Sequence, residues 1–177
     1  MANPEEVQGL VDRVLSEWGK IDILVNNAAI HEPKPVLETS LDDWNKTLTV
    51  NLASVFLCCK AVLKSMLCSG GGKIINISSG AGSRGFPGNA AYSASKGAIN
   101  AFSQALAGEV RKNGIAVNVL SPAHVDTEMH RQTKEDNPLV AADDFMSIED
   151  VVNTALFLAS DRRKQVVAMS VLPASRS

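Results

Sequence analysis

Hydrophobic positions along this chain follow two spacings, one typical of amphipathic helices and the other of buried strands. In residues 4–18 the apolar side chains recur every three or four positions, as on one face of a helix. Residues 21–26 and 74–77 are short, nearly continuous apolar runs rich in Ile, which is typical of strands buried on both faces. The pattern therefore predicts helices that alternate with strands.

Start and stop signals set the bounds of these elements. Asn3 before Pro4 is typical of a helix start, and Ser40 with Asp43 and Ser147 with Asp150 form two capping boxes. The pattern predicts helices over residues 4–18, 40–68, 91–112 and 147–158, and strands over residues 21–26, 74–77, 115–120 and 166–172. Such alternation favours an α/β fold with a parallel sheet and helices on both faces. No linker divides the chain, so we predict a single domain over residues 1–177.

Composition narrows the classes of function. The 177 residues are 45% hydrophobic and carry a formal net charge of −2. They suffice for a core, and they give no electrostatic reason to expect nucleic acid or an anionic membrane as a partner. No apolar run has the roughly 18 residues that cross a bilayer, and the first residues lack the features of a signal peptide. We predict a cytoplasmic protein with no membrane or nucleic-acid partner.

The cysteines and histidines match no metal-binding motif. Cys58, Cys59 and Cys68 lie on one predicted helix, with a spacing that fits no zinc site, and their odd number argues against a set of disulfides. We predict reduced, mostly buried thiols and no metal site.

Candidate chemistry centres on Tyr92 and Lys96, which lie four residues apart on a predicted helix. Positions i and i+4 share a helix face, with Cβ atoms about 5–6 Å apart. An ammonium group so close favours the phenolate, so we expect the pKa of Tyr92 to fall from its usual value of about 10. Ser79 follows a predicted strand, at the end where open α/β sheets bind ligands. The alternative is an ordinary exposed pair on a helix surface.

Two glycine-rich segments look like phosphate-binding loops and are interpreted otherwise. Residues 80–85 satisfy G-x-G-x-x-G, but residues 86–88 interrupt the helix that the dinucleotide fingerprint requires. We interpret them as a flexible loop beside the site. Residues 70–73 lack the frame of a phosphate loop and are predicted to form a turn.

Five segments, in order and over nearly the whole chain, resemble motifs of the short-chain dehydrogenase/reductase family. They are residues 22–29, 49–52 with Phe56, 75–79, 92–96, and 117–122 with Thr127. The resemblance implies a Rossmann-like doubly wound parallel sheet and NAD or NADP as cofactor. It also implies hydride transfer between the nicotinamide and a small-molecule carbonyl or alcohol substrate of the 3-oxoacyl, sugar or small-ketone type. Family members usually assemble through their long helices, so a homo-oligomer (dimer or tetramer) is implied.

The same resemblance implies a role for each candidate catalytic residue. Tyr92 would donate a proton to the carbonyl oxygen, and Ser79 would hydrogen-bond that oxygen. Lys96 would lower the pKa of the tyrosine and bind the nicotinamide ribose. Asn51 would hold a water that links Lys96 to solvent; an asparagine inside a helix, where its propensity is poor, often has a local polar task.

The resemblance also implies cofactor contacts beyond Tyr92 and Lys96. The residues concerned are Asn26, Asn27, Ala28, Pro122, Val125 and Thr127. The first three would line the adenosine side of the cofactor, and Val125, with Thr127 nearby, would approach the carboxamide. For Asn26 and Asn27 a strand-end turn that satisfies backbone groups is an alternative that can coexist with cofactor contact.

The sequence departs from the family pattern at its front. The glycine-rich phosphate loop and the ribose selector, on the order of 60 residues of a dinucleotide half, should precede Asn3 and are not in this chain. We expect an N-terminally truncated member with about four strands, in which residues 21–25 offer an open apolar edge. Two alternatives stay open: a non-catalytic fragment that acts as a subunit-interaction module, and a relative that binds a ligand without redox chemistry.

Overall fold

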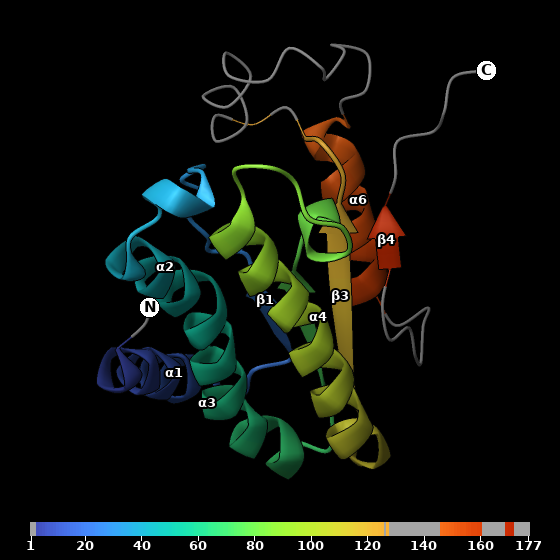
Figure 1. Ribbon diagram of the computed structural model, residues 1–177. Coiled ribbons are helices and arrows are strands. Elements are labelled where there is room, and N and C mark those ends of the chain that lie inside the picture. Colours follow the sequence, from blue (N-terminus) through green and yellow to red (C-terminus); the bar gives the residue numbers. More distant parts are fainter. Residues whose placement is uncertain (1–2, 126, 128–145, 161–168, 172–177) are drawn as a thin grey trace, which may run out of the picture.

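The computed structural model describes residues 3–125, 127, 146–160 and 169–171, which include one parallel sheet with helices on both faces (Figure 1). Its strands are β1 (Ile23–Asn26), β2 (Gly72–Ile77), β3 (Ile115–Pro122) and β4 (Met169–Val171). They are hydrogen-bonded in the order β1-β2-β3-β4, and every neighbouring pair is parallel. The predicted α/β class and the number of strands are confirmed.

Helices connect the strands where the sequence places their caps. The longer ones are α1 (Pro4–Trp18), α2 (Leu41–Leu48), α3 (Ser54–Cys68), α4 (Ala90–Val110) and α6 (Ile148–Ala159). Asn3 accepts from the backbone nitrogen of Glu5 at 2.9 Å, and both predicted capping boxes are formed. Short helical turns are η1 (Val36–Glu38), η3 (Gly80–Gly82) and η4 (Arg111–Asn113).

The core has a large part and a small part, one on each face of the sheet. The large cluster lies between the sheet and α1, α3 and α4, with Val55, Met66 and Ile99 at its centre. The small cluster lies under α6 and joins Leu158 to Ile75 and Leu120. Helices on both faces give the doubly wound layering that the sequence predicts.

β1 is less buried than its apolar sequence predicts. Ile23 and Val25 are 44% and 49% exposed, although a strand buried on both faces was expected. They lie on the face that α6 covers over β2 and β3, and no described element covers that face over β1. The open apolar edge expected for residues 21–25 is observed at β1.

The predicted helix over residues 40–68 is divided in the structure. Between α2 and α3 lies the π-helical segment η2 (Thr49–Ala53). The run Leu41–Cys68 is long and apolar enough, by length and composition, to cross a membrane. Its side chains Val55, Val62 and Met66 pack in the large core. Core helices of other proteins can have the same length and apolar composition, so these properties are weak evidence for a membrane span.

The described cysteines are free thiols, two of them buried. Cys58 and Cys59 lie inside the protein as predicted, whereas Cys68 is exposed at the end of α3. Burial raises the pKa of Cys59 to about 12, so this thiol stays protonated at neutral pH. No group of three or more metal-binding side chains is found among the described residues.

Candidate active site

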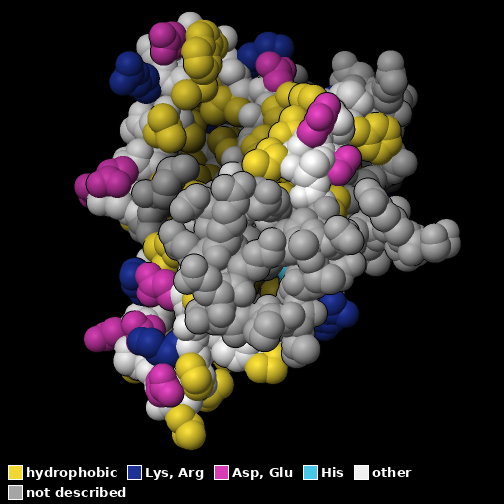
Figure 2. All heavy atoms as spheres, turned by 90° about the horizontal axis from the view of Figure 1, so that it is seen from above, with side chains coloured by type: hydrophobic (Ala, Val, Ile, Leu, Met, Phe, Trp, Pro, Cys, Tyr) yellow, Lys and Arg dark blue, Asp and Glu magenta, His cyan; other side chains and the backbone are white. Residues whose placement is uncertain are grey.

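The candidate catalytic residues lie at the carboxyl end of the sheet, where α4 begins beside the segment that follows β2. Ser79 precedes η3, and η3 packs closely on α4. A Cβ on Gly82 would lie 2.7 Å from the carbonyl carbon of Lys96, so only glycine allows this approach. Seen from this end in Figure 2, acidic and basic side chains are interspersed around the rim of the described surface.

Tyr92, Ser79 and Lys96 come together as the sequence predicts. Ser79 lies near enough to Tyr92 for its side chain to lower the pKa of the phenol. The Lys96 ammonium lies 5.6 Å from the centre of the Tyr92 ring and donates to the backbone oxygen of Ile77 at 2.9 Å. Lys96 is only 3% exposed. The arrangement places a phenol, a hydroxyl and an amine around one point at the strand ends.

Burial governs the pKa values of both titratable groups. It raises the pKa of Tyr92, an effect that the hydrogen bond with Ser79 partly offsets. It lowers the pKa of Lys96 from 10.5 to about 8. The expectation that Lys96 lowers the pKa of Tyr92 is therefore wrong for this structure. The ammonium faces the ring and donates to a backbone oxygen, and desolvation of the phenol dominates.

Asn51 lies fully buried in η2, and its side chain hydrogen-bonds both the loop after β1 and helix α4. Its Oδ1 accepts from the backbone nitrogen of Ile30 at 2.8 Å, and its Nδ2 donates to the backbone oxygen of Ile30 at 3.0 Å and to Ser95 Oγ at 3.2 Å. Ser95 in turn donates to the backbone oxygen of Tyr92 at 2.7 Å. Asn51 thus fixes backbone on both sides of the site, and its role in holding a water stays a prediction.

The three residues predicted on the adenosine side separate in the structure. Asn26 is buried, and its Nδ2 donates to Asn76 Oδ1 at 2.8 Å and to Cys59 Sγ at 3.4 Å. Its side chain faces the core, so the prediction that it lines the cofactor is corrected. Asn27 and Ala28, which directly follow β1, are exposed.

The residues predicted on the nicotinamide side follow β3 at the same edge of the sheet. Pro122 ends β3 and is buried, while Val125 and Thr127 are partly exposed. Val125 pairs with Met146 in an isolated parallel bridge, and its carbonyl oxygen accepts from the nitrogen of Thr127 at 2.8 Å. The Pro122 oxygen would lie 3.7 Å from a Cβ on Gly80, so this segment adjoins the Ser79 turn.

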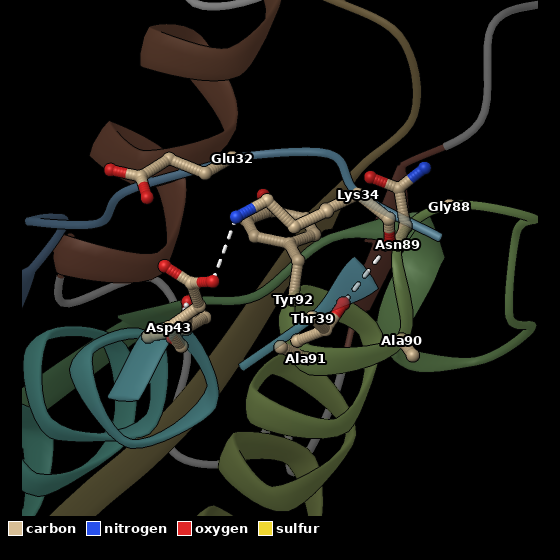
Figure 3. A pocket seen from close by; sticks show the side chains of 10 residues that line it. Glu32, Lys34, Thr39, Asp43, Gly88, Asn89, Ala90, Ala91 and Tyr92 are labelled. Atoms are coloured by element: carbon tan, nitrogen blue, oxygen red, sulfur yellow. Dashed lines mark hydrogen bonds and ion pairs between the residues drawn. The ribbon is translucent and has the colours of Figure 1, made fainter. Parts of the chain in front are cut away.

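A pocket opens beside Tyr92, between α2 and the start of α4 (Figure 3). Lys34 crosses it to Asp43, with Nζ and Oδ2 2.7 Å apart. The hydrogen bonds from Lys34 and Ser40 lower the pKa of Asp43 to about 2. The sequence predicted Asp43 only as part of a helix cap and gave no role to Lys34, because only the fold brings this loop to Tyr92.

His31 is a further neighbour of Tyr92 that the sequence did not indicate. Its ring centre lies 4.5 Å from that of Tyr92, with the planes tilted by 54°. The histidine positions show no metal-binding pattern in the sequence. No spacing between positions 31 and 92 signals their contact.

A parallel sheet with helices on both faces, and with Ser79, Tyr92 and the buried Lys96 at the carboxyl ends of its strands, defines the class of nucleotide-dependent α/β oxidoreductases. Comparisons with known proteins give the family. The model of the short chain dehydrogenase family matches residues 1–138. The chain belongs to the short-chain dehydrogenase/reductase family.

Individual relatives show how much of the family's length is present. A 3-oxoacyl-[acyl-carrier-protein] reductase of Synechocystis sp. is 39% identical over 91% of this chain and 66% of its own length. D-threitol dehydrogenase of Mycolicibacterium smegmatis is also 39% identical, over 91% of this chain and 64% of its own length. The chain therefore spans about two thirds of the length of these relatives.

A solved structure matches the same extent. The gluconate 5-dehydrogenase of Burkholderia cenocepacia, in complex with NADP and tartrate, superposes with a TM-score of 0.88 at 31% identity. The match covers 96% of this chain and 70% of that chain. Relatives that bind NADP support a nicotinamide cofactor for the family to which this chain belongs.

Proposed function

We propose that this chain carries the catalytic residues of an NAD(P)-dependent oxidoreductase that interconverts a carbonyl and an alcohol. One observation carries the proposal: at the carboxyl edge of the sheet the phenol of Tyr92 lies beside Ser79, with the Lys96 ammonium 5.6 Å from the centre of its ring. Perturbed titratable groups gathered at such an edge are typical of active sites.

The residues present fit the nicotinamide half of the cofactor better than its phosphates. The buried amine of Lys96 would bind the ribose, Val125 and Thr127 would face the carboxamide, and Asn27 with Ala28 would meet the adenosine side. The chain has no glycine-rich turn that opens a helix, so it offers no such carrier for the pyrophosphate. When bound, the reduced cofactor supplies a hydride to the carbonyl carbon.

The protein's own part is to supply a proton and to stabilise charge on the substrate oxygen. Because burial raises its pKa, Tyr92 is protonated at neutral pH and can donate its O–H proton as the oxygen gains negative charge. Ser79 donates a hydrogen bond to the same oxygen. Lys96, with a pKa of about 8, exchanges protons near neutral pH and can restore the proton of the phenolate. The product is the alcohol.

The substrate class rests on the relatives. Their names include a 3-oxoacyl thioester reductase, a tetritol dehydrogenase and a gluconate dehydrogenase. All three names fit a secondary alcohol or its ketone. We therefore propose a 3-oxoacyl-, sugar- or small-ketone-type substrate for this chain.

A second candidate is a subunit-interaction module without turnover. The outer face of α3 exposes Phe56 (46%) and Leu67 (45%), and Phe56 also contacts Phe102 of α4, with ring centres 6.2 Å apart. Exposed apolar side chains along long helices favour assembly. A homo-oligomer through α3 and α4 is the form this candidate would take, and it is compatible with catalysis.

The test is an assay of the purified chain with NADPH and NADH against a panel of 3-oxoacyl thioesters, ketoses and small ketones. We expect oxidation of one cofactor with at least one substrate class, and a loss of roughly 10²–10³-fold in kcat in Ser79→Ala. No turnover with any pair, together with a stable dimer or tetramer in solution, would contradict the enzyme and support the module.

A further inference from the structure

His31 touches the proposed proton donor but has no part in the chemistry set out above. Its imidazole lies 4.5 Å from the Tyr92 ring, centre to centre, in a tilted contact of the kind that aromatic rings prefer. Both side chains are partly buried. The contact is between the two rings, and Ser79 is the neighbour that lowers the pKa of the phenol.

The imidazole is itself fixed by a hydrogen bond at the start of α4. His31 Nε2 and Asn89 Oδ1 are hydrogen-bond partners, and Asn89 directly precedes the first residue of α4. The Asn89 amide is oriented by a second bond, from Nδ2 to the backbone oxygen of Pro87 at 3.1 Å. Its oxygen therefore faces His31, so Nε2 must be the donor, and in the neutral ring Nδ1 carries no proton.

The backbone that carries His31 is fixed as well. The preceding residue, Ile30, is bound through both its nitrogen and its oxygen by the buried amide of Asn51. The same amide reaches the Tyr92 backbone through Ser95. Asn51 therefore ties the loop that carries His31 to the helix that carries Tyr92.

We propose that His31 is a positioning residue, whose ring packs against the Tyr92 phenol and keeps its hydroxyl at Ser79. Asn89 and the Asn51–Ile30 pair fix the imidazole for this purpose. The described groups around the phenol include the Ser79 hydroxyl, the Lys96 ammonium and the His31 ring. The charged side chains of Glu32, Lys34 and Asp43 line the pocket beside it. The expected effect of His31 on the rate of turnover rests on the proposed function, whereas its expected effect on the ionisation of Tyr92 does not.

The composition of the chain supplies a readout that needs no turnover. Tyr92 is the only tyrosine, and the two tryptophans do not ionise, so the absorbance of phenolate reports this side chain alone. Burial raises its pKa, and His31→Ala uncovers one side of the ring. In an absorbance titration the alanine variant should therefore ionise at lower pH than the wild type, closer to the ordinary value of about 10.

Three further variants separate ring packing from a general loss of structure. His31→Phe keeps an aromatic ring and should titrate like the wild type. Asn89→Ala releases the imidazole and should shift the titration in the same direction as His31→Ala, by less. Leu37→Ala changes a fully exposed side chain on the same loop and should have no effect. If His31→Ala fails to fold, as seen by circular dichroism, Asn89→Ala still gives the comparison.

Kinetics provide the second arm. His31→Ala should lower kcat roughly 10- to 100-fold with the KM for cofactor unchanged, and His31→Phe should restore most of it, because a small misplacement of a reacting group has effects of this size. If the chain has no turnover, the proposed function fails while the titration still tests His31. A phenol that ionises at the wild-type pH in both His31→Ala and Asn89→Ala would overturn the inference, as would a His31→Phe variant that titrates like His31→Ala.

Discussion

Two polar networks lie on the α4 side of the sheet. They differ in whether their polar groups find all their hydrogen-bond partners inside the protein. The first joins Asn26, Asn76 and Ser103 in the core. The second is the site, in which Ser79, Tyr92 and Lys96 meet at the carboxyl end of the strands. Both are built of residue types that are usually exposed. The first also contacts the Cys59 thiol, which burial keeps protonated, whereas the second combines two titratable groups with shifted pKa values at a partly exposed position.

The core network uses its hydrogen-bonding capacity within the protein. Asn26 donates to Asn76, Asn76 donates to Ser103 at 2.8 Å, and Ser103 donates to the backbone oxygen of Ile99 at 2.7 Å. These bonds tie β1, β2 and α4 together below the site. The comparison shows that burial and polarity alone do not mark a functional residue; accessibility and a displaced pKa do.

The largest expected effect is a loss of turnover when the second network, the site, is changed. Tyr92→Phe removes the proton donor and keeps the ring, so kcat should fall by roughly 10²–10⁴-fold while the free energy of unfolding changes little. The measurement is turnover with saturating cofactor, beside a urea unfolding curve. Turnover close to that of the wild type would show that the phenol is not the acid.

A change in the core network should have the opposite result, a loss of stability without a loss of turnover. Asn76→Leu leaves Asn26 and Ser103 without their shared partner inside the core, and it should lower the free energy of unfolding by about 2–4 kcal/mol. Turnover per folded molecule should persist. Asn45→Leu, at an exposed position on α2, is the matched control and should change stability by less than about 0.5 kcal/mol. Equal effects of the two substitutions would remove the distinction between core and surface asparagines.

The close approach of η3 to α4 gives a sharper test of how the site is packed. Gly82→Ala would place its Cβ 2.7–2.9 Å from the backbone of Lys96 and Gly97, so we expect a loss of about 1–3 kcal/mol in stability and a weaker site. Gly85→Ala meets nothing within 4 Å and should be neutral. Chemical denaturation of both variants checks this. A neutral Gly82→Ala would contradict the packing of η3 on α4.

The smallest expected effect is one of pH. Lys96 has a pKa of about 8 in the folded protein and 10.5 as its ordinary value, so the unfolded chain binds more protons between these values. Its burial therefore lowers stability below about pH 8, and stability should rise between about pH 8 and 10.

Lys96→Met removes this dependence. At pH 7 the variant should be more stable by about 1–2 kcal/mol, since the loss of the bond to Ile77 offsets part of the gain, and it should have no turnover. Thermal melts at several pH values measure this. A wild type whose stability is flat from pH 7 to 10 would show that the amine is not buried as described.

The sequence predicted the parts of the fold that depend on local signals. The caps at Ser40 and Ser147 appear where the pattern placed them, and the four-residue spacing of Tyr92 and Lys96 brought the two onto one side of α4. The π-helical segment around Asn51 was not predicted, because the apolar periodicity continues through it. It depends on tertiary hydrogen bonds to Ile30 and Ser95.

Other parts could not be predicted because they depend on which face of an element is covered. Asn26 and Asn27 are adjacent and identical in type, yet the first faces the core and the second solvent. Nothing in the sequence distinguishes them until the register of β1 on β2 is known. The contact of His31 with Tyr92 likewise depends on the fold, which brings His31 next to Asn89, 58 positions away in the sequence, and so next to the start of α4.

The most direct test of the account is the ionisation of the single tyrosine in the wild type and in Ser79→Ala. Tyr92 should ionise above its ordinary pKa of 10, and higher still without Ser79, because the serine hydroxyl stabilises the phenolate. A phenol that titrates at the ordinary value and ignores the loss of Ser79 would show that the two groups do not meet, and the proposed site would not exist.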